Sequence, residues 1–596
     1  MASARPIPLA LLSAALLLSV PMAGLAQPSA PSTTAKPQQR QAQPPGRQVA
    51  AAIPLTGRYL AGRVAEQDHD YDTGADQLDM ALAQAPGDLE LAYSAFRLRI
   101  YAGRVDSAAQ LAPQLLVARP SDGLLNLVMA IQHIKKGDYR AAEQQVGRIG
   151  GQDQLGPLRD FVVAWLKAGQ KDFAGARAAL AKLKGGDANA QAPIVVIHAQ
   201  IDEMAGDRAA AEAKYRRAVD LDPSALRAVL TAADGLRRLG KEADARTILK
   251  SFGDKYSETV VMDGLLAANA PMPKPPSPAS GVAEIMFEIG GALNADPRNQ
   301  RGDLALIFEQ FAVELRPDHD FAWLTIAGLY EQWGNATKAL AAYNKVGPGS
   351  PLSWQARLRA AALDAQEDRL DEAVRKLKAL VAEKPDRVDA ALMLAELLRN
   401  KERYADAVAV YDTAIGRIKK VEERHWPVFF GRGIVLERIK QWPRAEVDMK
   451  KALELSPEQP YVLNYLGYSW IDQGLHLEAG MKMLKRATEL RPDDGAITDS
   501  VGWAYYRLGQ FDKAVEWLER ASEQKGEDAT VVEHLGDAYW HVGRFREARF
   551  QWNRALSQKP EKDRIPVILD KISNGLNPSN DKPTVYEKAA DTKQGG

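Results

Sequence analysis

Acidic residues gather in one short stretch near the start of the chain, at Asp68, Asp70 and Asp72. Counted as a twelve-residue calcium loop from Asp68, the stretch places Asp76 and Asp79 at two further ligand positions. However, Thr73 stands where the sharp turn of such a loop needs glycine, and Asp79 is shorter than the usual bidentate glutamate. A solvated turn between two helices, with carboxylates favoured at a helix start, is the preferred interpretation.

Other short strings imitate catalytic or cofactor sites but lack a required residue. The stretch from Gly235 to Lys241 begins like a phosphate-binding loop, but Glu242 replaces the required Ser or Thr. No two of the eight histidines have the i, i+4 spacing of a helical metal site, and His534 and His541 are interpreted as surface polar residues. The chain has no cysteine, which excludes disulfides, thiolate nucleophiles and Cys-ligated zinc. The sequence therefore predicts no catalytic residue, no cofactor and no metal ligand; an enzyme with a noncontiguous site is the disfavoured alternative.

The elements that would position any site repeat along the chain. The clearest copy spans residues 529–562, and the copy before it lies 34 positions earlier, since Gly502 matches Gly536 and Ala514 matches Ala548. Within a copy, apolar residues follow one stripe of a first helix and then one stripe of a second. Small residues stand where the two helices approach, and Pro560 cannot continue the second helix. Each copy is thus predicted to be a helical hairpin.

This pattern resembles the tetratricopeptide repeat, which has a Leu-Gly pair, a Tyr, an Ala, an aromatic residue, an Ala and a Pro. In the clearest copy these residues are Leu535, Gly536, Tyr539, Ala548, Trp552, Ala555 and Pro560. The resemblance covers about 500 residues and is strongest from 320 to 562. It implies an all-α fold, a right-handed α-solenoid of about fourteen hairpins.

Composition and periodicity divide the chain into segments. The 260–280 stretch is rich in proline and is predicted as a hinge between two arrays. After the last copy, apolar residues such as Ile568, Leu569 and Ile572 are predicted to cap the open end of the stack. The predicted segments are a signal peptide (1–26), a disordered linker (27–54), an N-terminal array (55–259), the hinge (260–280), a C-terminal array (281–562), a capping helix (563–576) and a disordered tail (577–596).

The first residues have the pattern of a secretory signal. Arg5 supplies positive charge, residues 7–20 form an apolar run, and Pro21 breaks it ahead of a small-residue cleavage site before Gln27. The alternative is an uncleaved inner-membrane anchor, because residues 7–26 could just span a bilayer. No later stretch is long and apolar enough to span. The pattern predicts a periplasmic protein without a transmembrane segment after cleavage.

The tetratricopeptide resemblance also implies a ligand groove, lined by positions 2, 5, 9, 12 and 13 of each first helix. Packing within the hairpin does not account for the large aromatic residues at these positions, so they are expected to be exposed. The alternative is that these rings pack against neighbouring helices or the terminal helix. With flanking carboxylates they would make a platform for an extended peptide or a sugar chain. In the last three copies the predicted groove residues are Asn464, Tyr468, Asp472, Asp499, Trp503, Tyr506, Arg507, Glu533, Asp537, Trp540 and His541.

The balance of basic and acidic residues restricts the classes of partner that the chain could bind. Lys plus Arg number 77 and so do Asp plus Glu, which argues against binding nucleic acid. The favoured hypothesis is a non-catalytic envelope scaffold that binds a protein partner through an aromatic, mildly acidic groove. The first alternative is a polysaccharide-export or cell-wall assembly factor that binds a glycan. The other is a purely structural spacer, which buried groove aromatics would favour. Neither the oligomeric state nor the identity of the partner follows from the sequence.

Overall fold

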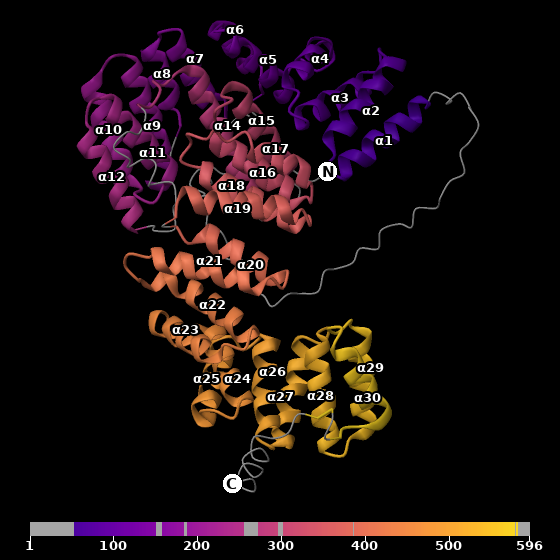
Figure 1. Ribbon diagram of the computed structural model, residues 1–596. Helices are drawn as coiled ribbons and strands as arrows, with labels where there is room; N and C mark the ends of the chain where they lie inside the picture. Colours follow the sequence, from indigo (N-terminus) through magenta and orange to yellow (C-terminus); the bar gives the residue numbers. More distant parts are fainter. Residues whose placement is uncertain are drawn as a thin grey trace. The chain divides into compact units, whose positions relative to one another are not determined.

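The computed structural model describes residues 53–150, 158–183, 188–255, 272–295, 302–385, 387–577 and 580–581. Within these ranges the chain forms 29 α-helices and one short 3₁₀ helix, with no strand (Figure 1). Within each unit of the described chain, successive helices pack against each other as hairpins, and a single helix, α30, follows the last hairpin. The predicted all-α solenoid of helical hairpins is confirmed.

The chain divides into two compact units, with the division after Lys376, inside α19. The hairpins up to that point are α1 (Leu55–Gln67) with α2 (Tyr71–Gln84), α3 (Leu89–Tyr101) with α4 (Val105–Ala118), α5 (Gly123–Lys135) with α6 (Tyr139–Gly147), α7 (Arg159–Gly169) with α8 (Phe173–Leu180), α9 (Ala188–Met204) with α10 (Arg208–Leu221), α11 (Leu226–Arg238) with α12 (Glu242–Lys255), α14 (Pro278–Ala295) with α15 (Asp303–Leu315), α16 (Asp320–Gln332) with α17 (Ala336–Tyr343), and α18 (Ser353–Gln366) with α19 (Leu370–Glu383).

The second unit carries the last five hairpins and the terminal helix. These are α20 (Asp389–Asn400) with α21 (Tyr404–Arg417), α22 (Trp426–Arg438) with α23 (Trp442–Leu455), α24 (Pro460–Asp472) with α25 (Leu477–Leu490), α26 (Gly495–Arg507) with α27 (Phe511–Gln524), α28 (Ala529–His541) with α29 (Phe545–Ser557), and α30 (Arg564–Asn574). A short 3₁₀ helix, η3 (Glu423–His425), precedes α22.

The repeated small residues allow each hairpin to close. A Cβ built on Gly536 of α28 would lie 2.5 Å from Nε1 of Trp552 on α29, and Ala548 beside it is fully buried. Asp528 accepts a hydrogen bond from the Thr530 amide and begins α28, because its carboxylate satisfies a free helix N–H. The helix ends just before Gly543, whose φ of 80° suits glycine. The spacing of the repeat is thus a packing requirement.

The predicted division at the Pro-rich stretch is wrong. Residues 260–271 of that stretch lie outside the described residues, but the helices after it pack against helices before it. Helix α14 contacts α5 and α7, and α15 contacts α3, α4 and α5. The prolines interrupt the helices, but they leave the apolar residues of α15, such as Phe308 and Phe311, free to bury against the first hairpins.

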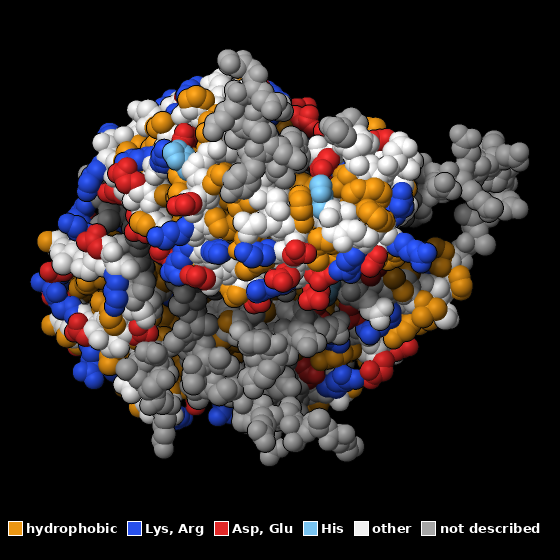
Figure 2. All heavy atoms as spheres, turned by 90° about the horizontal axis from the view of Figure 1, so that it is seen from below, with side chains coloured by type: hydrophobic (Ala, Val, Ile, Leu, Met, Phe, Trp, Pro, Cys, Tyr) orange, Lys and Arg blue, Asp and Glu red, His pale blue; other side chains and the backbone are white. Residues whose placement is uncertain are grey.

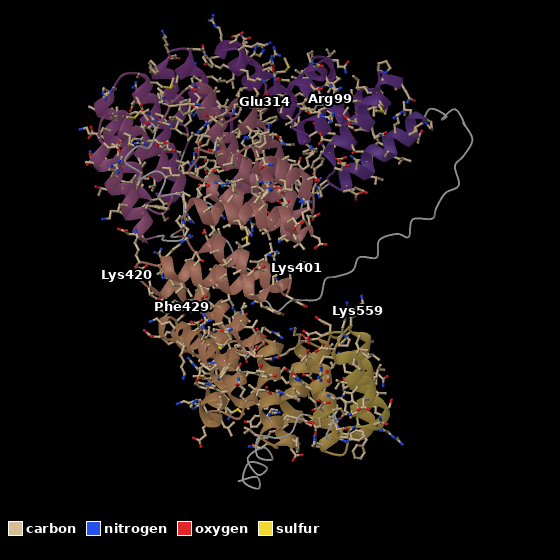
Figure 3. All side chains as sticks on the ribbon, in the orientation of Figure 1. Arg99, Glu314, Lys401, Lys420, Phe429 and Lys559 are labelled. Atoms are coloured by element: carbon tan, nitrogen blue, oxygen red, sulfur yellow. The ribbon has the colours of Figure 1, made fainter. Side chains whose placement is uncertain are left out.

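Polar contacts tie the same distant segments together within the first unit. The Tyr71 hydroxyl donates to Asp303 at 2.9 Å, and His69 stacks on Trp333 with ring centroids 4.3 Å apart. Lys135 of α5 donates to Glu314 of α15, which is labelled in Figure 3. The first unit is therefore held by contacts between hairpins far apart in sequence as well as between neighbours.

The aspartates of the acidic stretch near the start of the chain form hydrogen bonds with arginines and cap a helix. Asp70 caps α2 through the Thr73 amide, and Asp72 and Asp76 both accept hydrogen bonds from Arg104. Arg99, labelled in Figure 3, donates to Asp79 at 2.9 Å. No group of metal-ligating side chains occurs in the described part of the chain.

Helix α30 packs on α29 at the end of the second unit. Ile568 is fully buried there, but Leu569 is 46% exposed, so the prediction that it packs on the stack is wrong. None of the helices in the described ranges combines the length and apolar character needed to cross a membrane. The predicted signal peptide, most of the predicted linker and residues 582–596 of the predicted tail lie outside these ranges.

Candidate partner-binding groove

The predicted groove residues come together on one face of the second unit. They belong to α24, α26 and α28, the first helices of three successive hairpins, and α26 contacts both of its neighbours in this row (Figure 1). We call the surface formed by the eleven predicted residues the groove face. The repeat frame therefore places them on adjoining helices.

The expectation that the aromatic rings of the groove face are exposed is wrong. Trp503 is 5% exposed and Tyr506 is fully buried, while Tyr468 and Trp540 are half-buried and pack against the core. Trp503 lies between two parallel rings, with centroids 4.6 Å from Tyr506 and 3.9 Å from His534. The rings stack on each other along α26 and across to α28, because this buries more apolar surface than facing water does.

A second set of rings surrounds the end of α28. His541 stacks on Phe511 at 4.0 Å, and both meet the Tyr506 ring edge-on at 5.3 Å. Trp540 instead packs against Phe545 and Trp552 of α29. Of the eleven predicted residues, His541 is the most exposed.

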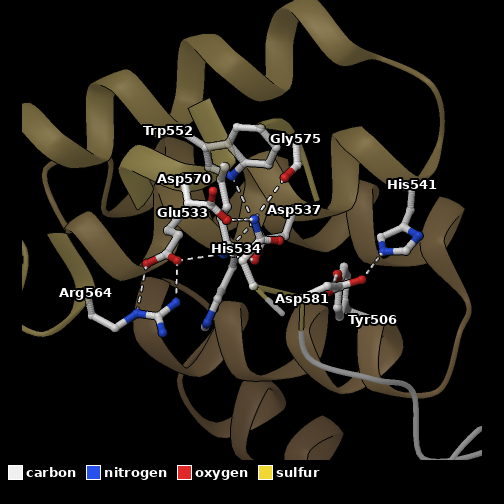
Figure 4. A network of polar contacts seen from close by, with 12 residues as sticks. Tyr506, Glu533, His534, Asp537, His541, Trp552, Arg564, Asp570, Gly575 and Asp581 are labelled. Atoms are coloured by element: carbon white, nitrogen blue, oxygen red, sulfur yellow. Dashed lines mark hydrogen bonds and ion pairs between the residues drawn. The ribbon is translucent and has the colours of Figure 1, made fainter. Parts of the chain in front are cut away.

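Two carboxylates of the groove face are neutralised by the terminal helix (Figure 4). Lys571 of α30, 1% exposed, donates to Glu533 at 2.7 Å and to both carboxylate oxygens of Asp537 at 2.9 and 2.7 Å. Arg564, two turns earlier on α30, also donates to Glu533. Burial alone would lower the pKa of Lys571, but the charges of Asp537 and Glu533 outweigh it and raise that pKa. The cation is therefore a permanent part of the site.

A third carboxylate is paired with a histidine. Asp499 of α26 lies 3.0 and 3.1 Å from Nδ1 of His534 on α28, and both groups are largely buried. Burial lowers the pKa of His534, but the charge and hydrogen bond of Asp499 outweigh this effect and leave it above its usual value. The mildly acidic groove predicted from the sequence is thus corrected: these carboxylates face cations inside the same unit.

Hydrogen-bond donors remain free on the groove face. Arg507 is 2% exposed, and it donates through Nη2 to the Asp472 carbonyl oxygen at 3.1 Å. Its Nε lies 3.8 Å from the Asp472 carboxylate as an ion pair, but neither Nε nor Nη1 has a hydrogen-bond partner. Nε1 of Trp503, which is also buried, has none either. On α24, the buried Oδ1 of Asn464 is unpartnered as well. Buried donors without partners are costly, so they mark a place where a ligand with acceptor oxygens would be stabilised.

Sequence reasoning missed several residues that shape the groove face. His534 is at a position assigned to the surface, yet it carries the Asp499 pair and the Trp503 stack. Lys571 and Arg564 lie seven residues apart, which is two turns of α30 and places both cations on one face of the helix. This spacing is the feature of the sequence that could have indicated their contact with the carboxylates of α28. Asp581, which contacts Tyr506 and His541, lies beyond every repeat and has no pattern that could identify it.

The fold and this face define a class of protein. Two family models, both described as tetratricopeptide repeat, match residues 364–425 and 502–563. These two stretches are similar to tetratricopeptide repeats, and such repeats suggest a scaffold for protein–protein interaction.

Among relatives, the TPR repeat-containing protein PA4667 of Pseudomonas aeruginosa is 28% identical over 196 residues, 33% of this chain and 32% of that protein. BBSome complex member BBS4 of Bos taurus is 24% identical over 151 residues, 25% of this chain and 28% of that protein. The chain therefore matches less than a third of the length of either relative.

Solved structures similar to this chain include the APC/C hetero-tetramer Cut9-Hcn1, with a TM-score of 0.37 and 15% identity, covering 88% of this chain and 96% of that one. Another is YrrB, described as a TPR protein with an unusual peptide-binding site, with a TM-score of 0.25 and 20% identity over 31% of this chain and 94% of that one.

Proposed function

We propose that this chain is a non-catalytic, exported scaffold that binds a protein partner through the groove face of its second unit. The observation that carries the proposal is the set of buried donors on α26 that make no hydrogen bond: Nε and Nη1 of Arg507 and Nε1 of Trp503. An extended peptide has a carbonyl oxygen at every residue, so it supplies acceptors of the kind that these donors lack.

A glycan is the weaker ligand. Sugar rings bind on open aromatic faces, but the faces of Trp503 are covered by Tyr506 and His534, and Phe511 covers one face of His541. The rings therefore stiffen the groove face instead of offering a platform. A bound partner would therefore contact the donors of Arg507 and Trp503 and the edges of the rings, and not the ring faces.

The test is cross-linking at the groove face in living cells. A photoreactive phenylalanine analogue replaces half-buried Asn464, and the matched control places it at Arg546, an exposed position on α29 with no recorded side-chain bond. A partner recovered from position 464 and not from 546 supports the proposal. Recovery of the same proteins from both positions contradicts it.

A second variant asks whether the free donors matter. Arg507→Met keeps the buried volume but removes the guanidinium, so partner recovery should fall about tenfold, the effect of losing a charged hydrogen bond. Arg546→Met, with the same chemical change on the exposed face, should leave recovery unchanged. Circular dichroism checks that both variants are folded.

The proposed location is the periplasm. It rests on the N-terminal charge, the apolar run and the small-residue site before Gln27. Mass spectrometry of the protein from a periplasmic extract should find a chain that begins at Gln27. A full-length chain in the membrane fraction would instead identify an uncleaved anchor.

A further inference from the structure

The chain after α30 turns back over the groove face. Gly575 has a φ of 76° and lies against Trp540, so close that a Cβ there would be 2.1 Å from the indole ring. The Asn580 side chain fixes the turn: its amide donates to Asp570 at 2.5 Å and to the Gly575 carbonyl at 3.0 Å. Asp581 follows, and its amide donates to the Asn577 carbonyl at 2.9 Å. We call Gly575–Asn577 with Asn580 and Asp581 the strap.

The strap places one carboxylate between α26 and α28. The Tyr506 hydroxyl donates to Asp581 Oδ1 at 2.5 Å, and Nε2 of His541 lies 2.9 Å from Oδ2 (Figure 4). Burial, together with Asp537 and Asp581, raises the pKa of Tyr506 far above its usual value, so the hydroxyl keeps its proton and donates. The carboxylate of Asp581 therefore meets a partner on each of the two helices.

The surroundings favour a carboxylate at this point. Asp499, Glu533 and Asp537 are occupied by His534, Arg564 and Lys571, while the free groups beside Tyr506 on α26 are the donors of Trp503 and Arg507. A ligand that continues along the groove face from this carboxylate would thus meet unsatisfied N–H groups and neutralised carboxylates.

We propose that Tyr506 and His541 form a carboxylate subsite, that Asp581 fills it within the same chain, and that an acidic side chain of an extended partner peptide displaces the strap to bind there. This inference rests on the proposed function, because it names the chemistry that the groove face recognises. The strap is then an internal competitor that sets how tightly a partner must bind.

The first test measures peptide binding by fluorescence anisotropy to the full-length chain. The probe is a labelled synthetic peptide with the sequence of residues 575–585, and its twin has Asn in place of Asp581. The Asp581→Ala chain should bind the acidic probe about tenfold more tightly than the unaltered chain does, because its subsite is empty. It should also prefer the acidic probe over the twin by about tenfold.

The control variant is Glu561→Ala, which removes an exposed carboxylate near the start of α30 that makes no recorded side-chain contact. It should bind both peptides as the unaltered chain does. Adding Tyr506→Phe or His541→Gln to the Asp581→Ala chain should abolish the preference between probe and twin. Equal binding of the two peptides to a folded Asp581→Ala chain would overturn the subsite.

The second test locks the strap. Because the chain has no cysteine, Asp570→Cys with Asn580→Cys provides a single pair of thiols that a short bismaleimide can join, and it leaves Tyr506, His541 and Asp581 unchanged. Locking should lower partner recovery through position 464 about tenfold, compared with the same chain left unlinked. Unchanged recovery would refute competition by the strap and leave the proposed function standing. If the peptides behave as expected but position 464 captures no partner, only the proposed function fails.

Discussion

Lys571 shows at the scale of one residue what holds the end of the second unit. Its ammonium group is buried between Glu533 and Asp537, and Trp552 also donates to Asp537 at 2.8 Å. Removing the cation leaves two buried carboxylates without their main partner. Lys571→Met should therefore lower the free energy of unfolding by about 3–5 kcal/mol.

Urea unfolding followed by circular dichroism measures this loss, with exposed Lys562→Met as the control. Changing Glu533→Gln and Asp537→Asn together with Lys571→Met should recover part of the stability, because the uncompensated charges are gone. A Lys571→Met chain as stable as the control would show that the triad carries no net stability.

Glu309 is the opposite case, a buried acid without a partner. It is fully buried on α15, neither carboxylate oxygen has a hydrogen-bond partner, and burial raises its pKa well above the usual range. A raised pKa means that the folded state holds the proton more tightly than the unfolded chain. Stability is therefore full at low pH and is lost as the pH rises through the raised value.

Nearby Glu288 acts in the same direction, because burial and the charge of Glu284 raise its pKa to about 8, against the opposing charge of Arg227. The melting temperature should thus fall between about pH 5 and pH 9. Glu309→Met should raise stability by about 1–3 kcal/mol at pH 8 and flatten this fall. Glu309→Gln should also reduce the fall in melting temperature with pH, but without the gain in stability. A pH profile that is identical in the unaltered chain and both variants would show that Glu309 does not cause the fall.

Which residues share the groove face could be predicted from the sequence, but their exposure could not. The repeat frame places Trp503, Tyr506 and Trp540 on first helices, and the structure agrees. Whether a ring faces water depends on the side chains of the next helix, such as His534 against Trp503. The position of Asp581 depends on the turn at Gly575, which no helical period encodes.

At the scale of elements, the closure of each hairpin depends on its small residues. Gly536→Ala should destabilise the second unit by about 1–3 kcal/mol, because its Cβ would overlap Trp552, which is fully buried. Gly416→Ala on α21 is the matched control, since a Cβ there meets nothing within 4 Å. It should be neutral or stabilising by up to about 1 kcal/mol, because alanine is the better helix former. Equal effects of the two changes would refute the close approach of α28 and α29.

The terminal helix is the other element with a testable role. Deleting Asp563–Leu576 removes Ile568 and Lys571 and leaves the end of α28 and α29 uncovered. The deletion variant should aggregate, which size-exclusion chromatography with light scattering would detect. A variant that stays monomeric and melts like the parent chain would refute the capping role.

Hairpins and their caps follow closely from local sequence, because the 34-residue spacing, the glycine ends and the prolines all act within one repeat. Contacts between distant repeats do not follow. Packing of α15 on α3, α4 and α5 results from small rotations summed over several hairpins, and no single repeat determines that sum. This is why a proline-rich stretch was mistaken for a boundary.

The whole molecule is electrically balanced. On the face shown in Figure 2, basic and acidic side chains are interspersed, in agreement with the equal totals of 77. Such a surface offers no extended field for a polyanion, so recognition must come from local geometry of the kind found on the groove face.

The division after Lys376 makes a last prediction about cooperativity. In an open array each repeat contacts only its neighbours, but the first unit also joins hairpins far apart in sequence through Tyr71 with Asp303 and Lys135 with Glu314. These distant contacts should make the first unit melt as one block, separately from the second. Calorimetry should resolve two transitions, with Glu309→Met shifting only one and Lys571→Met only the other. A single transition that both variants shift equally would show instead that the two units unfold as one.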